Sequence, residues 1–150
     1  GSALVVASSI KEPKPLVCAW IFNANNTMVG AGYSGLLMRC DDDAFPCEKQ
    51  GNCLQTKYPY ICHAELHAIL NNIGMVLHGC KIYTALFPCN ECAKAIIQSG
   101  IVEVIYLSDK YAGNDTAKAS RLMLDKAGLS CRKVLTGISS IILSCNEADV

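Results

Sequence analysis

The chain has no surplus of either charge, few aromatic residues and no long hydrophobic run. Its 150 residues carry 13 lysines and arginines against 13 aspartates and glutamates, and aromatic residues make up 7 %. Because a protein that binds a phosphate backbone usually carries a basic surplus, this balance argues against polymeric DNA or RNA as a substrate. A local basic patch is still compatible with it.

No apolar run approaches the length of a membrane-spanning helix, and the stretch 138–143 is interrupted by two serines. It is far shorter than the roughly 18 residues that a membrane-spanning helix needs, so we expect no membrane partner. The first residues show no charged segment followed by an apolar signal segment. We therefore expect a cytoplasmic protein, with the nucleus as the alternative.

Hydrophobic residues make up 51 % of the chain and charged residues 17 %. This composition is typical of a compact globular domain, and the length suits one such domain rather than two. We predict a single domain over residues 1–150, in which Gly1-Ser2 looks like the remnant of an expression tag. A helical pattern begins at Ala3 without a capping residue, so we expect the natural chain to extend further toward its N-terminus.

Ten cysteines allow a disulfide framework, which must be weighed against free thiols. The chain is not small, and Cys18, Cys80, Cys131 and Cys145 lie in apolar or strand-like segments, where free cysteine behaves as a small hydrophobic residue. A reducing compartment therefore fits better than an oxidising one.

The hydrophobic pattern predicts strands that alternate with helices after an initial hairpin. The expected strands are 16–22, 28–33, 81–87, 101–107 and 129–135, with 140–144 as a further candidate, and the expected helices run from Cys62 to about Gly74, over 89–98 and over 116–127. An asparagine-rich turn joins the first two strands, and a long irregular loop covers 34–60. This order predicts an α/β fold, a three-layer α/β/α sandwich with a mixed five-stranded sheet and helices on both faces.

Two short motifs carry the chemistry. His63-Ala64-Glu65 opens one predicted helix, and Cys89 and Cys92 open another. One imidazole and two thiolates are three ligands for Zn²⁺, and the fourth position is left for water, as in catalytic zinc sites. Zinc would lower the pKa of that water toward about 7. Glu65 would move protons from the water to the ring and the leaving amine, which is the chemistry of a zinc-dependent nucleobase deaminase.

These motifs also allow two interpretations without catalysis. In a closed structural zinc site Glu65 would be a surface residue, but such a site normally has four protein ligands and the pattern supplies three. Alternatively, the histidine motif and a Cys-x-x-C redox pair could be unrelated. The joint occurrence of both motifs, each at a helix start after an extended segment, favours catalytic zinc.

Longer strings around these motifs resemble deoxycytidylate (dCMP) deaminases, a family of the cytidine deaminase superfamily. The strings are 56–60, 62–69, 86–94 and 108–111, and the likeness runs from about Ala3 into the last predicted strand. The resemblance implies a cytidine deaminase-like fold and hydrolytic deamination of dCMP to dUMP with release of ammonia, which supplies dTMP synthesis. It also implies a homo-oligomer that is activated by dCTP and inhibited by dTTP.

The resemblance places family roles on matching residues. It implies substrate contacts at Asn23 (to the sugar), Ala64 and Tyr111, and an effector or phosphate region at Tyr33, Ser34 and Gly35. The family usually has asparagine where this chain has Ser34, glycine where it has Cys18, and asparagine where it has His67. Since Cys18 is expected close to the base pocket, substrate choice and effector control are the properties that these departures put in question.

Cys40, Cys47 and Cys53 lie in the long loop and suggest a second, structural zinc, with His67 as a candidate fourth ligand. The spacing matches no standard zinc ribbon, and free thiols on a loop are the alternative.

Other functions stay open at this point. One is a deaminase of another cytosine nucleotide or nucleoside. A second is a tRNA adenosine deaminase, for which we expect a more basic surface and a glutamate at the position of Phe87. A third is a zinc-binding regulatory homologue without catalysis, although the retained Glu65 argues against it.

Overall fold

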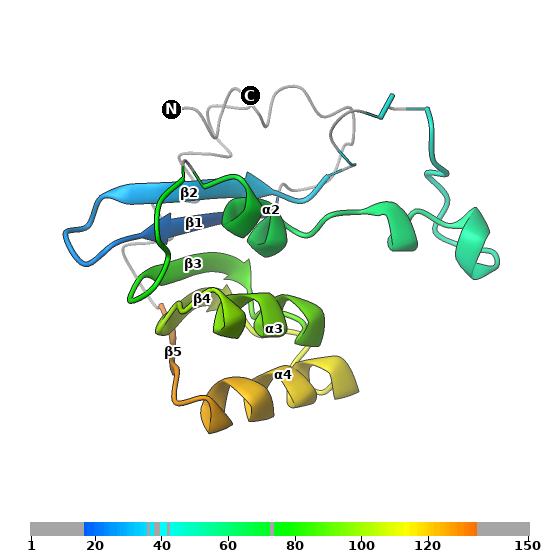
Figure 1. The fold of residues 1–150 in the computed structure, drawn as a ribbon. Helices are drawn as coiled ribbons and strands as arrows, with labels where there is room; N and C mark the ends of the chain where they lie inside the picture. Colours follow the sequence, from blue (N-terminus) through cyan, green and yellow to red (C-terminus); the bar gives the residue numbers. More distant parts are fainter. Residues whose placement is uncertain (1–16, 36, 38–39, 42, 73, 135–150) are drawn as a thin grey trace.

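The computed structural model describes residues 17–35, 37, 40–41, 43–72 and 74–134, and within them a five-stranded mixed sheet (Figure 1). The strands are β1 (Cys18–Phe22), β2 (Met28–Tyr33), β3 (Lys81–Leu86), β4 (Glu103–Ser108) and β5 (Ser130–Lys133), in the spatial order β2-β1-β3-β4-β5. β1 is antiparallel to β2 and β3, whereas β3, β4 and β5 are parallel. The predicted mixed sheet with parallel β-α-β units is confirmed. The candidate strand 140–144 and the helical pattern from Ala3 lie outside the described residues.

Asn23 shapes the turn between β1 and β2. Its side-chain Oδ1 accepts hydrogen bonds from the backbone N–H groups of Asn25 and Thr27, both at 2.9 Å. Asn26 adopts φ 59°, the left-handed conformation that asparagine tolerates better than most residues. The predicted asparagine-rich hairpin turn is therefore present.

The described part of the chain contains three α-helices, α2 (Ala64–Leu70), α3 (Asn90–Gln98) and α4 (Asp115–Lys126). α3 and α4 match their predicted ranges to within one residue, and each is followed by a glycine with positive φ, Gly100 and Gly128. α2 ends earlier than predicted. The side chain of Asn72 donates to the carbonyl of Ile69 at 2.7 Å and accepts from the N–H of Met75 at 3.0 Å, which turns the chain out of the helix. None of the helices in the described part of the chain is long and apolar enough to cross a membrane.

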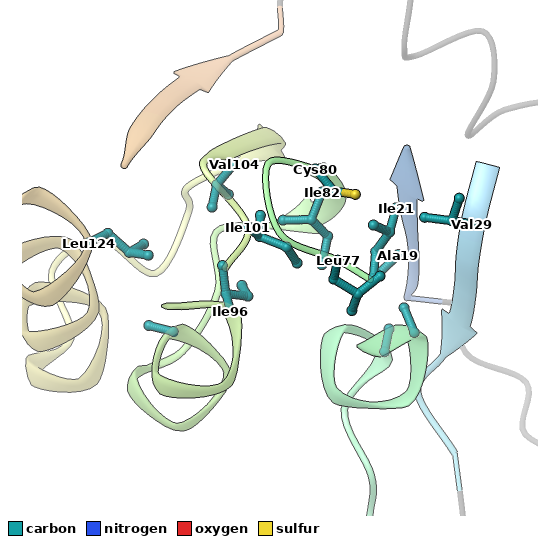
Figure 2. Close-up of a cluster of buried hydrophobic side chains, with 13 residues drawn as sticks. Ala19, Ile21, Val29, Leu77, Cys80, Ile82, Ile96, Ile101, Val104 and Leu124 are labelled. Atoms are coloured by element: carbon teal, nitrogen blue, oxygen red, sulfur yellow. The ribbon is translucent and has the colours of Figure 1, made fainter. Parts of the chain in front are cut away.

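The main core lies between the sheet and these helices (Figure 2). Alternation along β1 sends Ala19 and Ile21 into this core and sends Cys18 and Trp20 to the opposite face. There Cys18 and Trp20 are each 5 % exposed and pack with Phe22 and Tyr83. The described helices form one layer, and the segment expected to begin a helix at Ala3 lies outside the described residues.

The long loop before α2 has its own internal contacts. It contains the short 3₁₀ helices η1 (Cys53–Gln55) and η2 (Tyr58–Tyr60). The ring of Tyr60 stacks on Phe45 with centroids 4.7 Å apart, and its hydroxyl donates to the carbonyl of Leu54 at 2.9 Å. Sequence periodicity missed these turns because each spans only three residues.

The helix α2 approaches β2 so closely that only glycine fits at position 32. A Cβ on Gly32 would lie 2.3 Å from the backbone N of Ala68 and 2.5 Å from the carbonyl oxygen of Ala64. Since both atoms belong to the backbone of α2, a side-chain rearrangement cannot relieve the clash with an added Cβ.

We predict that Gly32→Ala lowers the free energy of unfolding by about 3 kcal/mol, the upper range for overpacking a core. Denaturant unfolding measures this change. Gly113→Ala is the control, because a Cβ there meets nothing within 4 Å. Equal stability of the two variants would contradict the tight helix–sheet contact.

Candidate zinc-dependent active site

Two helix starts meet at the carboxyl end of β3. His63 precedes α2 with extended backbone angles (φ −67°, ψ 152°), and Cys89 precedes α3 in the same conformation (φ −72°, ψ 171°). Pro88 precedes Cys89 and has no N–H to donate, so the sheet does not continue and the chain turns into α3. On the other side, the backbones of Gly35 and Cys62 exchange hydrogen bonds of 2.8 and 3.1 Å, which fixes the segment before His63.

The three predicted ligands converge. His63 Nδ1 lies 3.4 Å from the Sγ of Cys89 and 3.5 Å from the Sγ of Cys92. The three ligand atoms all lie within 4.8 Å of one another. Tetrahedral zinc, with bonds of about 2.3 Å to sulfur and about 2.1 Å to nitrogen, requires ligand atoms about 3.6 Å apart. The donor set and its spacing therefore fit Zn²⁺.

The protonation of the two thiols also suits a cation. Hydrogen bonds from Cys92 and then from His63 lower the pKa of Cys89 to about 3, despite the opposing effect of burial. The pKa of Cys92 is raised, first because it keeps the proton shared with Cys89 and then because it is buried. Contact with Cys89 raises the pKa of His63. A lowered pKa favours the thiolate form of Cys89, which is the form that ligates a metal.

Glu65 lies beside the ligands on the first turn of α2. It is only 5 % exposed, and its Oε2 accepts a hydrogen bond from the Sγ of Cys92 at 3.6 Å. Burial raises the pKa of its carboxyl, which brings the group closer to the range in which it can both accept and release a proton near neutral pH. A closed structural site with Glu65 on the surface does not match this geometry.

A cavity of about 280 Å³ opens onto the ligands. At the metal end it is lined by His63, Glu65 and Cys89. The rest of the wall is neutral and consists of Val17, Ser34, Ala64, Leu86, Phe87, Tyr111, Asn114, Thr116 and Ala117. Such a cavity offers one reactive end and a mostly apolar wall with a few polar groups, as small-molecule sites do.

The predicted substrate residues Ala64 and Tyr111 both line this cavity. Tyr111 is 54 % exposed, and Lys110 Nζ lies 5.2 Å from its ring centroid. Ser34 also lines the cavity, whereas Tyr33 packs its ring against His67 at 4.9 Å. His67 Nδ1 donates to the carbonyl of Tyr33 at 3.0 Å. The segment 33–35 thus lies against the active site and the helix that carries Glu65.

The side chains of Asn23 and Cys18 lie outside the cavity lining in this structure. Asn23 follows Phe22, which pairs with Lys81 at the start of β3, whereas the ligands follow the end of β3. Its side chain is used in the hairpin turn, so it lies away from the site and does not contact a sugar there. The segment 17–19 does reach the pocket, because Val17 lines the cavity, but the side chain of Cys18 packs with Trp20 on the face of the sheet opposite the helices. Strand alternation decides this, because neighbouring side chains point to opposite faces.

Nor does the structure assemble the second zinc site. Within the described residues the one group of metal-ligating side chains is His63, Cys89 and Cys92. Cys40, Cys47 and Cys53 are exposed, and the ring nitrogen of His67 is bonded to Tyr33. The nine described cysteines are free thiols in this structure, and Cys145 lies outside the described residues.

Sequence reasoning missed the contribution of the segment after β4 to the cavity, in particular Asn114 and Thr116. A topological signal was available. β3 and β4 are parallel neighbours, so the loops after both strands meet at the same edge of the sheet, where α/β proteins bind ligands.

Comparison with known proteins decides the family. Residues 2–108 match the model of the cytidine and deoxycytidylate deaminase zinc-binding region. The chain belongs to this deaminase family.

Individual relatives agree with that assignment. Human deoxycytidylate deaminase is 49 % identical over 142 residues, which cover 94 % of this chain and 80 % of the human protein. The probable deoxycytidylate deaminase of Drosophila melanogaster is 46 % identical over 138 residues, covering 88 % of this chain and 68 % of that protein. The crystal structure of dCMP deaminase from the cyanophage S-TIM5 in complex with dCMP and dUMP shares the fold. Its TM-score is 0.62 at 18 % identity, over 89 % of this chain and 92 % of that one. The predicted cytidine deaminase-like fold is confirmed.

Proposed function

We propose that the protein is a zinc-dependent dCMP deaminase, which converts dCMP and water to dUMP and ammonia. The observation that carries this proposal is the convergence of His63, Cys89 and Cys92 beside a buried carboxylate, Glu65, at the end of a cavity. The substrate is inferred from relatives named as deoxycytidylate deaminases at 46–49 % identity over most of the chain. The free thiols of the described cysteines and the formal net charge of zero are compatible with a cytoplasmic enzyme.

Each residue of the site has its own role in the proposed reaction. His63, Cys89 and Cys92 would hold Zn²⁺, which when bound supplies an activated water near neutral pH. Glu65 Oε2 accepts a proton from the attacking water and delivers it to N3 of the cytosine ring while a C4–O bond forms. It then carries the proton of the new C4 hydroxyl to the amino group, and the C4–N bond breaks as the C4 carbonyl forms, so that ammonia leaves. Because Glu65 is buried, its carboxylate is not solvated by bulk water and stays directed at the reacting centre.

The wall of the cavity orients the rest of the nucleotide. The aromatic ring of Tyr111 presents a half-exposed face for a base or sugar, and Ala64 leaves room beside Glu65 because its side chain is a single methyl group.

A panel of substrates tests the proposed function. The zinc-loaded protein is incubated with dCMP, dCTP, CMP, deoxycytidine and an adenosine-containing tRNA loop, and ammonia release is measured. We expect turnover of dCMP with kcat/KM at least about tenfold above that of the other substrates, one well-placed interaction being worth roughly that factor. A preference for dCTP, CMP or deoxycytidine would change the assigned substrate but not the proposed deamination mechanism. No turnover of any compound, with zinc bound, would favour the regulatory homologue.

Effector control and assembly are separate proposals. Ser34 lines the cavity and Gly35 is hydrogen-bonded to Cys62, next to the ligand His63. A nucleotide bound near 33–35 could therefore shift the segment that carries a zinc ligand. We propose activation by dCTP and inhibition by dTTP in a homo-oligomer, tested by titrating both nucleotides into the dCMP assay and by light scattering.

A further inference from the structure

Asn114 lines the catalytic cavity, and its side chain makes no capping hydrogen bond to the helix that it precedes. Asn114 is the N-cap residue of α4, with the extended backbone of that position (φ −73°, ψ 147°). Asparagine is favoured there because its side-chain oxygen accepts a hydrogen bond from the first turn of the helix. Asn114 makes no such bond, although it has the right residue type and the right backbone.

The N-cap residues of the two other helices at the cavity also make no side-chain capping hydrogen bond. His63 and Cys89 are the N-cap residues of α2 and α3, and neither makes a side-chain capping bond. In both cases the side chain is committed to the reactive centre instead. Asn114 is the third N-cap residue on the wall of this cavity.

The charges of the wall indicate which part of a nucleotide Asn114 meets. Among the described residues that line the cavity, the ionisable ones at the metal end are His63, Glu65 and Cys89, and no lysine or arginine lines the wall. The described residues of the wall therefore offer a doubly charged phosphate no counter-charge. Lys110, the neighbour of Tyr111, lies outside the lining set. The wall around Asn114 therefore suits a neutral polar group.

A side-chain amide both donates and accepts hydrogen bonds, and so does a hydroxyl. In dCMP the 2′ position carries no oxygen and the 5′ oxygen is esterified, so the free sugar hydroxyl is at 3′. We propose that Asn114 is a specificity-determining residue that binds the 3′-hydroxyl of the nucleotide substrate. This inference rests on the proposed function, and it assigns to Asn114 the sugar contact that the family resemblance implied for Asn23.

The test compares the binding of two ligands by the Glu65→Gln protein (the parent) and by the same protein that also carries Asn114→Ala. Dissociation constants for dCMP and for 2′,3′-dideoxycytidine 5′-monophosphate are measured by calorimetry in zinc-loaded protein carrying Glu65→Gln, so that neither ligand is consumed. We expect Asn114→Ala to weaken dCMP binding about tenfold, the order expected for one lost hydrogen bond. Binding of the dideoxy nucleotide should be the same in both proteins. An equal loss for both ligands, or no loss for dCMP, would overturn the proposal. If Asn114→Ala weakened the binding of dCMP but not of deoxycytidine, which lacks the phosphate, Asn114 would instead bind the phosphate.

Asn23→Ala is the matched control. It removes an asparagine whose Oδ1 accepts two hydrogen bonds in the hairpin, far from the cavity. We expect Asn23→Ala to lower the melting temperature by about 5 °C and to leave dCMP binding unchanged. Asn114→Ala should weaken dCMP binding and leave the melting temperature unchanged. If the parent binds dCMP but the wild-type protein does not deaminate it, the proposed function fails while the dissociation constants still decide the role of Asn114. Failure to bind dCMP at all would overturn both.

Discussion

Glu65→Gln is expected to lower kcat for dCMP by a factor of about 10³ to 10⁴, near the upper range for the loss of a general acid–base group. The amide has the same shape as the carboxylate but cannot accept the proton of the attacking water. Because Glu65 is 5 % exposed, solvent cannot easily replace it as a base. Steady-state ammonia release measures the effect. Zinc content should not change, since His63, Cys89 and Cys92 remain.

Glu91→Gln is the matched control for this substitution. Glu91 lies between the two ligand cysteines in sequence, but it is exposed and forms an ion pair of 2.8 Å with Lys94. Exposed pairs of this kind contribute little to stability, so activity and folding should stay within about twofold of the wild type. If Glu65→Gln kept more than a tenth of the activity, another group would have to carry the proton.

Removal of zinc is the second change with a large expected effect. Chelation should abolish deamination, and added Zn²⁺ should restore it. A ligand present at about 1,000 times its dissociation constant stabilises the folded state by about 4 kcal/mol. For a domain of this size we therefore expect the melting temperature to fall by about 10 °C. Calorimetry before and after chelation measures that fall.

Elemental analysis of the same samples counts the metal. We expect one zinc per chain, lost in Cys92→Ser and kept in Cys53→Ser, because Cys92 is a ligand and Cys53 is exposed outside the cluster. A ratio near two that falls in Cys53→Ser would restore the second site at Cys40, Cys47 and Cys53. Full activity of metal-free protein would contradict the zinc mechanism.

Much of the fold was predictable because the local hydrophobic periodicity and the glycine positions match the observed helices and strands. β2 was predicted with its observed bounds, and α3 and α4 to within one residue, since their apolar periodicity is strong and glycines mark their ends. The early end of α2 was not predictable in the same way. It depends on two side-chain hydrogen bonds of Asn72, and periodicity carries no information about them.

The amino-acid sequence by itself determined the reaction centre. Zinc chemistry demands particular residue types at short spacings, and His63, Glu65, Cys89 and Cys92 meet that demand within two local motifs. Only the tertiary structure decided which other side chains share the cavity. Strand alternation moved Cys18 to the far face, and strand direction moved Asn23 to the far end of the sheet. The parallel pairing of β3 with β4 brought Asn114 to the wall beside the ligands. These positions depend on the pairing of strands far apart in the chain, and no local spacing encodes that pairing.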